Sequence, residues 1–389
     1  MSSGAEAEPW RTWVDGANDR VRDAGRWRAP RAFDAAGPEG TLTATGDRVV
    51  SFASNDYLGL SQHPAVVAAA HDALDRWGAG SGAARLIVGS RPVHHDLEDA
   101  LATWRGTEAA VVFPTGFAAN LGVLSTLAAP GVRICSDALN HASIIDGCRL
   151  ARADGAEVRV YPHRDLDVLD ALLAEPGAER RVVVTDTVFS MDGDVADVDA
   201  LVGLCGRHGA LLVLDEAHAV LQEPPAVPTG GPVVVQVGTL SKTLGALGGF
   251  VAGPRAVVDL LVNRARSYIF TTASSPADTA AALAAVAVVS SPEGEARRDR
   301  LRAHVGRLRP GHPSPVVAVV LGEEEEALAA SSRLLDAGLL VPAIRPPTVP
   351  AGTSRLRIAL SAAHTDDQLD RLVAALAALA APSSPGRPS

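Results

Sequence analysis

Short apolar runs alternate with longer amphipathic segments through most of this chain, beginning near residue 64. The short runs are rich in Val and Leu and predict strands at Ala109–Phe113, Val132–Ser136, Glu157–Tyr161, Arg181–Thr185, Ala210–Leu214 and Val233–Val237. The longer segments predict helices at Pro64–Trp77, Val93–Arg105, Phe117–Leu127, Ala142–Ala151, Leu166–Ala174 and Val198–His208. Nearly continuous apolar strands are typical of a sheet that is covered on both faces. The pattern therefore predicts an α/β fold built on a mostly parallel, doubly wound sheet.

Both ends of the chain depart from this alternation. The first 50 residues predict only a short helix at Asp19–Trp27 and a hairpin near Gly40–Phe52. After two more helices, at Pro254–Arg266 and Pro276–Val289, the pattern breaks near Ser290. The elements beyond the break suggest a smaller α+β domain and are predicted at Val316–Leu321, Glu323–Ala337, Leu339–Ile344, Arg355–Leu360 and Thr365–Leu379.

These patterns divide the chain into four predicted parts. They are an N-terminal segment (1–55), a large domain (56–290), a small C-terminal α+β domain (291–381) and a tail (382–389). A chain of 389 residues is long enough for two domains. The tail is rich in Pro and Ser, and we expect it to be disordered.

Composition narrows the classes of function. The formal net charge is −10 and the pI is about 5.6, which argues against nonspecific nucleic-acid binding and against a basic membrane-binding face. The sequence contains no uninterrupted apolar stretch of membrane-spanning length, and its acidic start does not resemble a signal peptide. Cys135, Cys148 and Cys205 are odd in number and lack the spacing of metal ligands. We expect a cytoplasmic protein that binds no metal.

The basic residues are distributed unevenly. Lys242 is the only lysine, and every other residue of the Lys and Arg class is an arginine. Arginine can pair with carboxylates and keep a protein soluble, but it cannot offer a neutral primary amine that condenses with an aldehyde. A single lysine can survive by chance in an arginine-rich composition. Its position within Val237–Gly245, after a predicted strand, instead suggests that the amine itself is needed.

Polar residues follow several other predicted strands. In an open α/β sheet, ligands bind beyond the carboxyl ends of the strands. Asp215 ends an apolar run and needs a cationic partner if it is buried, for which a protonated pyridine nitrogen is suitable. His218 lies three residues on, and His141 stands where an imidazole could stack on a flat ring. The plainer alternatives are a capping role for Asp215, a chance position for His218 and helix capping by the neighbours of His141.

A candidate phosphate site lies between another strand and its helix. The backbone amides of Thr115–Phe117 could hold a phosphate at the helix N-terminus, although a plain turn with a helix cap is the alternative. Thr239 and Ser241 stand where hydroxyl groups could reach the same phosphate. A phosphate cradle, a carboxylate, a ring stacker and one amine together predict a pyridoxal phosphate site.

The chain resembles the α-oxoamine synthase family of fold-type I pyridoxal phosphate enzymes over roughly residues 20–380. The matching blocks are SNDYLGL (54–60), GAGSGAARLIVGS (78–90), PTGFAAN (114–120), HASIIDG (141–147), VFSMDGD (188–194), DEAH (215–218), GTLSK (238–242) and AIRPPTVPAGTSRLRIALSAAHT (343–365). The set as a whole, rather than any one block, is specific. The resemblance implies a large coenzyme-binding domain followed by a smaller α+β domain.

The resemblance also implies roles for single residues. Lys242 matches the lysine that carries the coenzyme as a Schiff base and acts as general base, Asp215 the partner of the ring nitrogen, and His141 the stacking histidine. The other implied coenzyme contacts are Gly116, Phe117, Ser190, His218 and Thr239. The implied substrate contacts are Arg26, Asn55, Thr348 and Arg357, with Asn55 and Arg357 at the positions that handle the amino-acid carboxylate.

Within the family, the last block is most similar to enzymes of biotin biosynthesis. This similarity implies condensation of L-alanine with a pimeloyl thioester, carried by CoA or acyl carrier protein, with loss of CO2. It also implies a homodimer with the active site at the interface. One segment departs from the family, because the glycine-rich stretch that usually follows DEAH is replaced by the shorter Ala219–Gly231. The alternatives are a related synthase that joins glycine to acetyl-CoA or another acyl-CoA, and a noncatalytic binding protein with the same fold.

Overall fold

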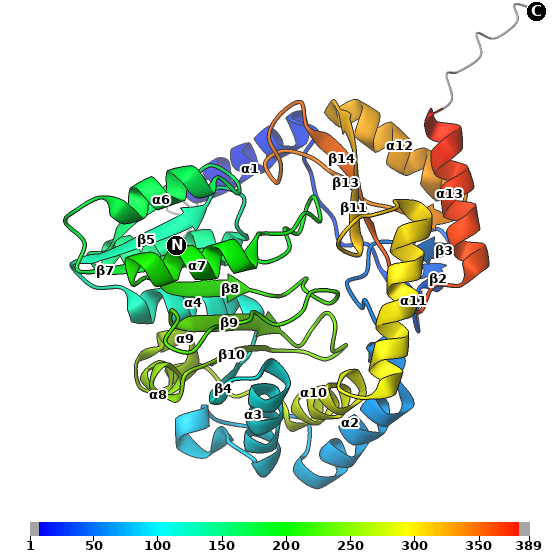
Figure 1. The fold of residues 1–389 in the computed structure, drawn as a ribbon. Coiled ribbons are helices and arrows are strands. Elements are labelled where there is room, and N and C mark those ends of the chain that lie inside the picture. The colour runs from blue at the N-terminus through cyan, green and yellow to red at the C-terminus, as the bar shows by residue number, and fades with distance from the viewer. Residues whose placement is uncertain (1–7, 381–389) are drawn as a thin grey trace, which may run out of the picture.

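The computed structural model describes residues 8–380 and contains one large mixed sheet and two smaller ones (Figure 1). The large sheet has seven strands in the order β4-β10-β9-β8-β7-β5-β6. Their bounds are β4 Ala109–Phe113, β5 Val132–Asp137, β6 Glu157–Tyr161, β7 Arg180–Asp186, β8 Leu211–Asp215, β9 Val234–Thr239 and β10 Gly249–Gly253. Only β10 runs antiparallel to its neighbours, while β6, β5, β7, β8 and β9 pair in parallel. The predicted mostly parallel, doubly wound sheet is confirmed.

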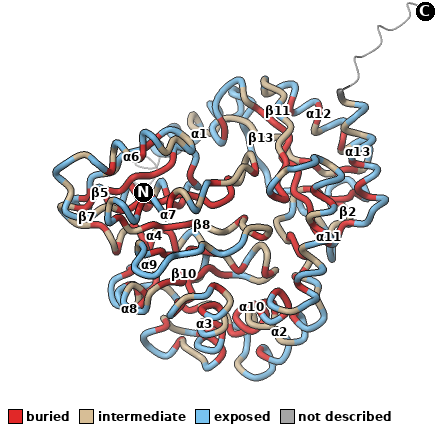
Figure 2. The backbone as a smooth tube through the Cα atoms, viewed as in Figure 1, coloured by how far each residue is buried: buried red, intermediate tan, exposed pale blue. Residues whose placement is uncertain are grey.

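Helices cover both faces of this sheet because successive strand residues point to opposite sides. On β8, Val213 packs in the cluster beneath α4, whereas Leu212 and Leu214 pack with α7. The helices of the first face are α4 Gly116–Leu127, α5 Ala142–Ala153, α8 Arg255–Arg264 and α9 Arg266–Ile269. Those of the other face are α3 Pro92–Arg105, α6 Leu166–Ala174 and α7 Val198–His208. Except for the edge strand β6, the strands of this sheet are accordingly buried along most of their length (Figure 2).

The C-terminal part of the chain forms a smaller α+β unit. Its sheet has the order β11-β14-β13, with β11 Val316–Gly322, β13 Ala343–Ile344 and β14 Ser354–Ala359. Its helices are α11 Pro292–Leu308, α12 Glu324–Asp336 and α13 Asp366–Ala380. A third sheet joins the two ends of the chain in the order β1-β2-β3-β12, with β1 Phe33–Ala35, β2 Glu39–Leu42, β3 Arg48–Ser51 and β12 Leu339–Leu340. The N-terminal hairpin therefore belongs structurally with the C-terminal unit.

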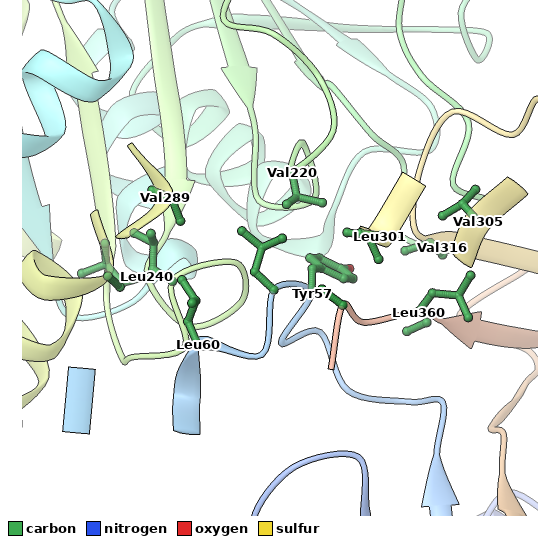
Figure 3. Close-up of a cluster of buried hydrophobic side chains, with 14 of the residues drawn as sticks. Tyr57, Leu60, Val220, Leu240, Val289, Leu301, Val305, Val316 and Leu360 are labelled. Carbon is green, nitrogen blue, oxygen red and sulfur yellow. The ribbon is translucent and has the colours of Figure 1, made fainter. Parts of the chain in front are cut away.

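An apolar cluster holds the two units together and supports the segment that carries Lys242 (Figure 3). Leu240 and Leu244 flank that lysine and are fully buried in this cluster. The cluster continues through Tyr57 and Leu301 to Leu360 at the end of β14. The remaining helices near it are η1 Leu60–Gln62, α2 Pro64–Trp77 and α10 Pro276–Val289, and the short π-helix η2 spans Arg85–Gly89.

Most predicted elements are confirmed within one or two residues, but the structure corrects several. The predicted helix Asp19–Trp27 is wrong, because α1 spans Glu8–Asp23. Its apolar residues, including Trp10 and Val14, follow a helical spacing that the surrounding charges obscure, and the helix ends before Gly25, which has a φ of 62°.

Three further corrections concern elements after residue 240. Strand β10 and helix α11 were not predicted, since β10 begins and ends with glycine and α11 is rich in arginine. The predicted helix Pro254–Arg266 is divided into α8 and α9 at Ala265. The predicted strand Leu339–Ile344 is two short strands in different sheets.

Some expectations lie beyond these observations. The predicted tail, residues 382–389, falls outside the described residues, and the domain boundaries at 55 and 290 stay predictions. Within residues 8–380, none of the helices has both the length and the apolarity required to cross a bilayer.

Candidate active site

The carboxyl ends of β7, β8 and β9 bring the candidate residues to one edge of the large sheet. In register, Asp186 at the end of β7 faces Asp215 at the end of β8, and Asp215 faces Val237 on β9. Lys242 lies in the connection between β9 and β10, just beyond this edge. The position of Asp215 at the end of a predicted strand is therefore confirmed. We call His141, Asp186, Asp215, His218 and Lys242 the strand-end cluster.

The Lys242 amine lies inside this cluster beside an imidazole. Its Nζ is 2.7 Å from Nε2 of His218, whose residue is only 4% exposed. Burial lowers the pKa of Lys242, although the carboxylates of Asp215 and Asp186 act in the opposite direction. Burial and the Lys242 charge also lower the pKa of His218 well below its ordinary value. A lysine whose pKa is lowered reaches its neutral, nucleophilic form more readily.

The Asp215 carboxylate is buried and accepts hydrogen bonds. Its Oδ2 accepts from Nδ2 of Asn120 at 2.6 Å, and its Oδ1 accepts from the Ala217 N–H at 2.9 Å. Among residues 8–380 no arginine, lysine or histidine forms a salt bridge with it. A buried anion held only by neutral donors favours a cationic ligand.

His141 stands at the N-cap of α5, with Nδ1 turned toward that helix. Nδ1 is 2.7 Å from Oγ of Ser143 and 3.3 Å from its backbone nitrogen. The backbone N–H of His141 donates to Oδ2 of Asp186 at 2.8 Å. The residue as a whole is exposed, and partial burial of the imidazole lowers its pKa. His141 itself therefore caps α5, whereas the alternative assigned the capping to its neighbours. The stacking role of His141 stays a prediction.

The carboxyl group of Asp186 is buried beside that of Asp215. Burial, reinforced by the Asp215 carboxylate, raises the pKa of Asp186 well above its usual range. Its backbone is fixed by Asn140, whose Oδ1 accepts from the Asp186 N–H at 2.9 Å. Burial therefore favours the protonated form of the Asp186 carboxyl group.

A cradle suited to a phosphate lies at the N-terminus of α4. Thr115 caps this helix by accepting from the Ala118 N–H at 3.0 Å, which leaves the N–H groups of Gly116 and Phe117 before the first helical bond. A Cβ on Gly116 would lie 3.3 Å from the Cβ of Thr239. The Thr239 hydroxyl lies at the other side of the cradle, 2.7 Å from the Ser241 hydroxyl. The predicted strand-to-helix turn is confirmed, with both hydroxyls beside it.

A second polar group joins the small unit to the cluster. Nη2 of Arg357 donates to Oδ1 of Asn55 at 3.2 Å, and the Tyr57 hydroxyl donates to the same oxygen at 3.0 Å. Tyr57 in turn lies 2.6 Å from Nδ1 of His218. Nε of Arg357 donates to the backbone oxygen of Ser190 at 2.5 Å. Four of the predicted residues, Asn55, Ser190, His218 and Arg357, are thereby brought together.

Two predicted substrate residues lie apart from this network. Arg26 donates from Nη2 to Oε1 of Glu324 at 2.8 Å, in a pair whose side chains are 43% and 26% exposed. Thr348 is exposed, and its N–H donates to the Arg345 oxygen at 3.0 Å. Arg345 also lies 3.5 Å from Glu324, so both predicted residues border one polar patch on the small unit. Their substrate roles stay predictions.

The segment that departs from the family pattern borders a cavity of about 730 Å³. Residues 219–231 contain neither helix nor strand. Val220–Pro224 line the cavity together with Trp104 and Phe250. Glu216 also lines the cavity, on the opposite side of the sheet from α4.

Several residues of the site escaped sequence reasoning. Asn120 and Ser143 are buried partners of the cluster, and Tyr57 links it to Arg357 through Asn55. Asn120 lies one helical turn after Gly116, where a polar residue on an apolar helix face is a signal of buried hydrogen bonding. The partner itself could not be read from the spacing.

Comparison with protein families defines the class of protein. The model of class I and II aminotransferases matches residues 47–376. The chain belongs to this family and is a pyridoxal phosphate-dependent enzyme. Among solved structures, serine palmitoyltransferase from S. paucimobilis with bound PLP is similar at a TM-score of 0.86 and 31% identity, covering 96% of this chain and 98% of that chain.

The curated relatives narrow the family to α-oxoamine synthases. The 8-amino-7-oxononanoate synthase of Geobacter sulfurreducens is 45% identical over 93% of this chain and 96% of its own length. The enzyme of the same name from Burkholderia mallei is 50% identical over 86% of this chain and 90% of its own length. A solved 8-amino-7-oxononanoate synthase from Francisella tularensis has a TM-score of 0.70 and 26% identity, covering 85% of this chain and 96% of that chain. The predicted family and coenzyme are confirmed.

The residues present fit pyridoxal phosphate. The cradle at Gly116 has no side chain in it, and a Cβ on Gly249 would lie 2.4 Å from the Gly116 nitrogen, so β10 can approach the cradle only as glycine. The anion Asp215 has no cation of its own, and the Lys242 amine has no carboxylate partner within salt-bridge distance in the described chain. These are the groups that the phosphate, the ring nitrogen and the aldehyde of the coenzyme require.

Proposed function

We propose that this enzyme condenses L-alanine with a pimeloyl thioester, releasing CO2 and a free thiol and forming 8-amino-7-oxononanoate for biotin synthesis. The thioester is carried by CoA or by acyl carrier protein. The names of the curated relatives support the reaction. The single observation in the structure that carries the proposal is the position of Lys242, the sole lysine, beside His218 and within the field of Asp215.

The proposed coenzyme contacts follow from the geometry. Lys242 would hold the aldehyde carbon, Asp215 the ring nitrogen, and the N–H groups of Gly116 and Phe117 the phosphate, together with the Thr239 hydroxyl. We propose His141 as the stacking residue, and Ser190 and His218 as neighbours of the ring. When bound, pyridoxal phosphate supplies an electron-withdrawing ring that stabilises negative charge at the amino-acid Cα.

The protein residues supply binding and proton transfer. Arg357 and Asn55 would hold the alanine carboxylate, since the Arg357 guanidinium is oriented by Asn55 and by the Ser190 carbonyl. Lys242 would remove the Cα proton as general base, because burial favours its neutral form. The Cα carbon would then attack the thioester carbonyl, the thiol would leave, CO2 would be lost, and Lys242 would return a proton to Cα. Arg26 and Thr348 are proposed to contact the acyl substrate.

The first test exploits the single lysine. Borohydride treatment of the holoenzyme should fix one pyridoxyl group on the peptide that contains Lys242, with no second lysine to confuse the assignment. Lys242→Ala should lose the adduct and all condensation activity, which mass spectrometry and a thiol-release assay would measure. Retained turnover in this variant would eliminate the proposed role.

The substrates need a separate test. Purified enzyme should release CO2 and thiol from isotopically labelled L-alanine with a pimeloyl thioester, and mass spectrometry should show the labelled nine-carbon product. Glycine with acetyl-CoA or another acyl-CoA is the matched comparison. A preference for that pair would assign a different α-oxoamine synthase reaction. A spectral response to alanine without thiol release from any thioester would favour a noncatalytic binding protein.

We also propose a homodimer as the working form. Leu86, Ile87 and Val88 on η2 are 51%, 74% and 68% exposed, and Phe270 is 71% exposed. The two segments are joined by a hydrogen bond from the Ala273 N–H to the Ala83 oxygen at 3.0 Å. Exposed apolar residues on two neighbouring segments favour burial by a second copy of the chain. Light scattering of the native protein should give twice the monomer mass. In Ile87→Glu the measured mass should fall toward that of the monomer.

The cytoplasmic location stays a prediction.

A further inference from the structure

Four polar side chains form an unbroken chain of hydrogen bonds on the α4 side of the strand-end cluster. Asp215 Oδ2 is 2.6 Å from Asn120 Nδ2, which is 2.9 Å from Ser143 Oγ. Ser143 Oγ is 2.7 Å from His141 Nδ1. Asn120 is 2% exposed and Ser143 is fully buried. The chain therefore connects the proposed ring-nitrogen partner to the proposed ring stacker through two residues with no assigned role.

The direction of each proton in this chain is determined by chemistry. An ionised carboxylate only accepts, so the Asn120 amide turns its NH2 group toward Asp215, and its second N–H points to Ser143. The Ser143 hydroxyl accepts from Asn120 and still has its own proton, which it can donate to Nδ1 of His141, 2.7 Å away. The Ser143 backbone N–H points to the same nitrogen at 3.3 Å. With two donors directed at Nδ1, the imidazole proton belongs on Nε2.

The orientation of the Asn120 amide leaves one of its polar atoms without a hydrogen bond. Its Oδ1 is buried and accepts no hydrogen bond from any described residue. A buried amide oxygen without a donor destabilises the fold. The opposite orientation would direct Oδ1 at the Asp215 carboxylate, which is a repulsive contact, so the unsatisfied oxygen accompanies the bond to Asp215.

We propose that Asn120 is a positioning residue that, through Ser143, keeps His141 neutral with its proton on Nε2 and reserves the Asp215 carboxylate for a cationic group of the ligand. Protonation of His141 would place a third hydrogen at Nδ1, where the two Ser143 donors already point. The coenzyme half of this statement rests on the proposed function, whereas the proton arrangement is a property of the protein alone.

The charged groups near His141 make such control necessary. Asp215 lies close enough to favour a protonated imidazole, and Asp186 accepts the His141 backbone N–H. Lys242 and His218 act on the cluster from the other side. Without Asn120 and Ser143, the His141 imidazole could become protonated, and its positive charge would then offset the negative charge of Asp215. The proposed ring stacker would then compete with the ring nitrogen for the same carboxylate.

The test is a pH titration of the apoprotein by NMR of ¹⁵N-labelled histidine side chains, with His141→Gln used to assign the signals. The expected result for the native chain is one neutral tautomer with the proton on Nε2. In Asn120→Leu and in Ser143→Ala, the protonation equilibrium of His141 should move toward the charged form by roughly five-fold, the size of one neutral hydrogen bond. Ser143→Ala leaves the Asn120–Asp215 bond in place and tests the second link alone.

A matched control lies on the same helix. Thr126 is buried on α4, and its hydroxyl accepts and donates no hydrogen bond within the described chain, so Thr126→Val should leave the His141 titration unchanged. The second readout is the affinity for pyridoxal phosphate of the native protein, Asn120→Leu, Ser143→Ala and Thr126→Val. It should fall roughly five-fold in Asn120→Leu and stay constant in Thr126→Val.

The outcomes separate this proposal from the proposed function. A native His141 with its proton on Nδ1 would overturn the proposal, as would an unchanged titration in Asn120→Leu or in Ser143→Ala. If Asn120→Leu fails to fold, the titration of Ser143→Ala alone decides it. Failure of the alanine condensation assay would leave the NMR result standing, because that result needs neither coenzyme nor substrate.

Discussion

Asp215 and Glu216 are adjacent at the end of β8, but they face opposite sides of the sheet and are held differently. Asp215 faces α4 and receives hydrogen bonds from Asn120 and a backbone amide. Glu216 faces the end of α3, where it pairs with Arg105, and Arg105 also donates from Nε to Oε1 of Gln236 at 2.7 Å. Both carboxyl groups are buried, and within residues 8–380 only Glu216 forms a salt bridge with a cation.

The difference indicates how a functional carboxylate can be told from a structural one. Neutral donors stabilise Asp215 without cancelling its charge, so the charge remains available to a ligand. Arg105 pairs with Glu216 inside the fold, so little of the Glu216 charge is available to a ligand. Asp137, at the end of β5, resembles Glu216, because Nδ1 of His163 lies 3.0 Å from its Oδ1. The paired carboxylates should matter for stability and the unpaired one for activity.

The largest expected effect is on activity, from Asp215→Asn. The substitution keeps the shape of the side chain and removes the charge, so alanine Cα–H exchange and condensation should fall by roughly 100- to 1,000-fold. Glu216→Gln is the matched control one residue along, with condensation expected within about two-fold of the native rate. Deuterium exchange at alanine Cα measures the step directly. Normal exchange in Asp215→Asn, or an equal loss in Glu216→Gln, would break the comparison.

The second effect concerns stability and its dependence on pH. Burial raises the pKa of Glu216 to about 7, assisted by the Asp215 charge and opposed by Arg105. The folded protein therefore binds this proton more tightly than the unfolded chain, and native stability falls as pH rises from about 4.5 through 7. Glu216→Gln lacks the titration, so its stability relative to the native protein should improve by about 2–3 kcal/mol between pH 5 and 8. Urea unfolding of both proteins at pH 5 and pH 8 would measure the difference in the free energy of unfolding. The same difference at both pH values would contradict the prediction.

The smallest effect extends the comparison to His163. Burial lowers the pKa of His163, but hydrogen bonds to Asp137 and Asp194 outweigh it and raise the value to about 9. A histidine with a raised folded-state pKa contributes stability that is complete below about pH 6.5 and is lost as pH rises through 9. His163→Gln should cost roughly 1 kcal/mol at pH 6, after allowance for the exposed part of the ring, and almost nothing at pH 10. An equal cost at both pH values would show that packing, not charge, holds these carboxylates.

Much of the fold could be predicted because its signals are local. The apolar runs of β5, β7 and β8 and the caps that follow them are legible within ten residues of sequence, and their parallel arrangement follows from the intervening helices. Strand β10 was missed because glycine at both ends hides a strand. Helix α11 was missed because arginine dominates it and only a narrow stripe, including Leu301 and Val305, is buried.

The candidate site divides in a similar way. Lys242, Asp215 and His141 could be singled out since each stands directly after a strand that the pattern reveals. Arg26 and Thr348 could be nominated only by resemblance. Arg26 pairs with Glu324, and the Thr348 N–H bonds to the Arg345 oxygen, so the contacts of both lie outside the strand-end cluster. Tyr57 was missed because its link to His218 joins residues 161 positions apart.

The sequence by itself determined which chemical groups stand at the strand ends, because a strand and its cap are specified by neighbouring residues. It also determined that a single amine serves the whole chain, since no other lysine exists. Only the tertiary structure decided what surrounds those groups. Asn120 meets Asp215 across 95 positions because α4 packs over β8, and the same sheet turns Glu216 away toward Arg105. Whether a buried carboxylate keeps its charge for a ligand depends on such distant contacts, which pattern and spacing do not record.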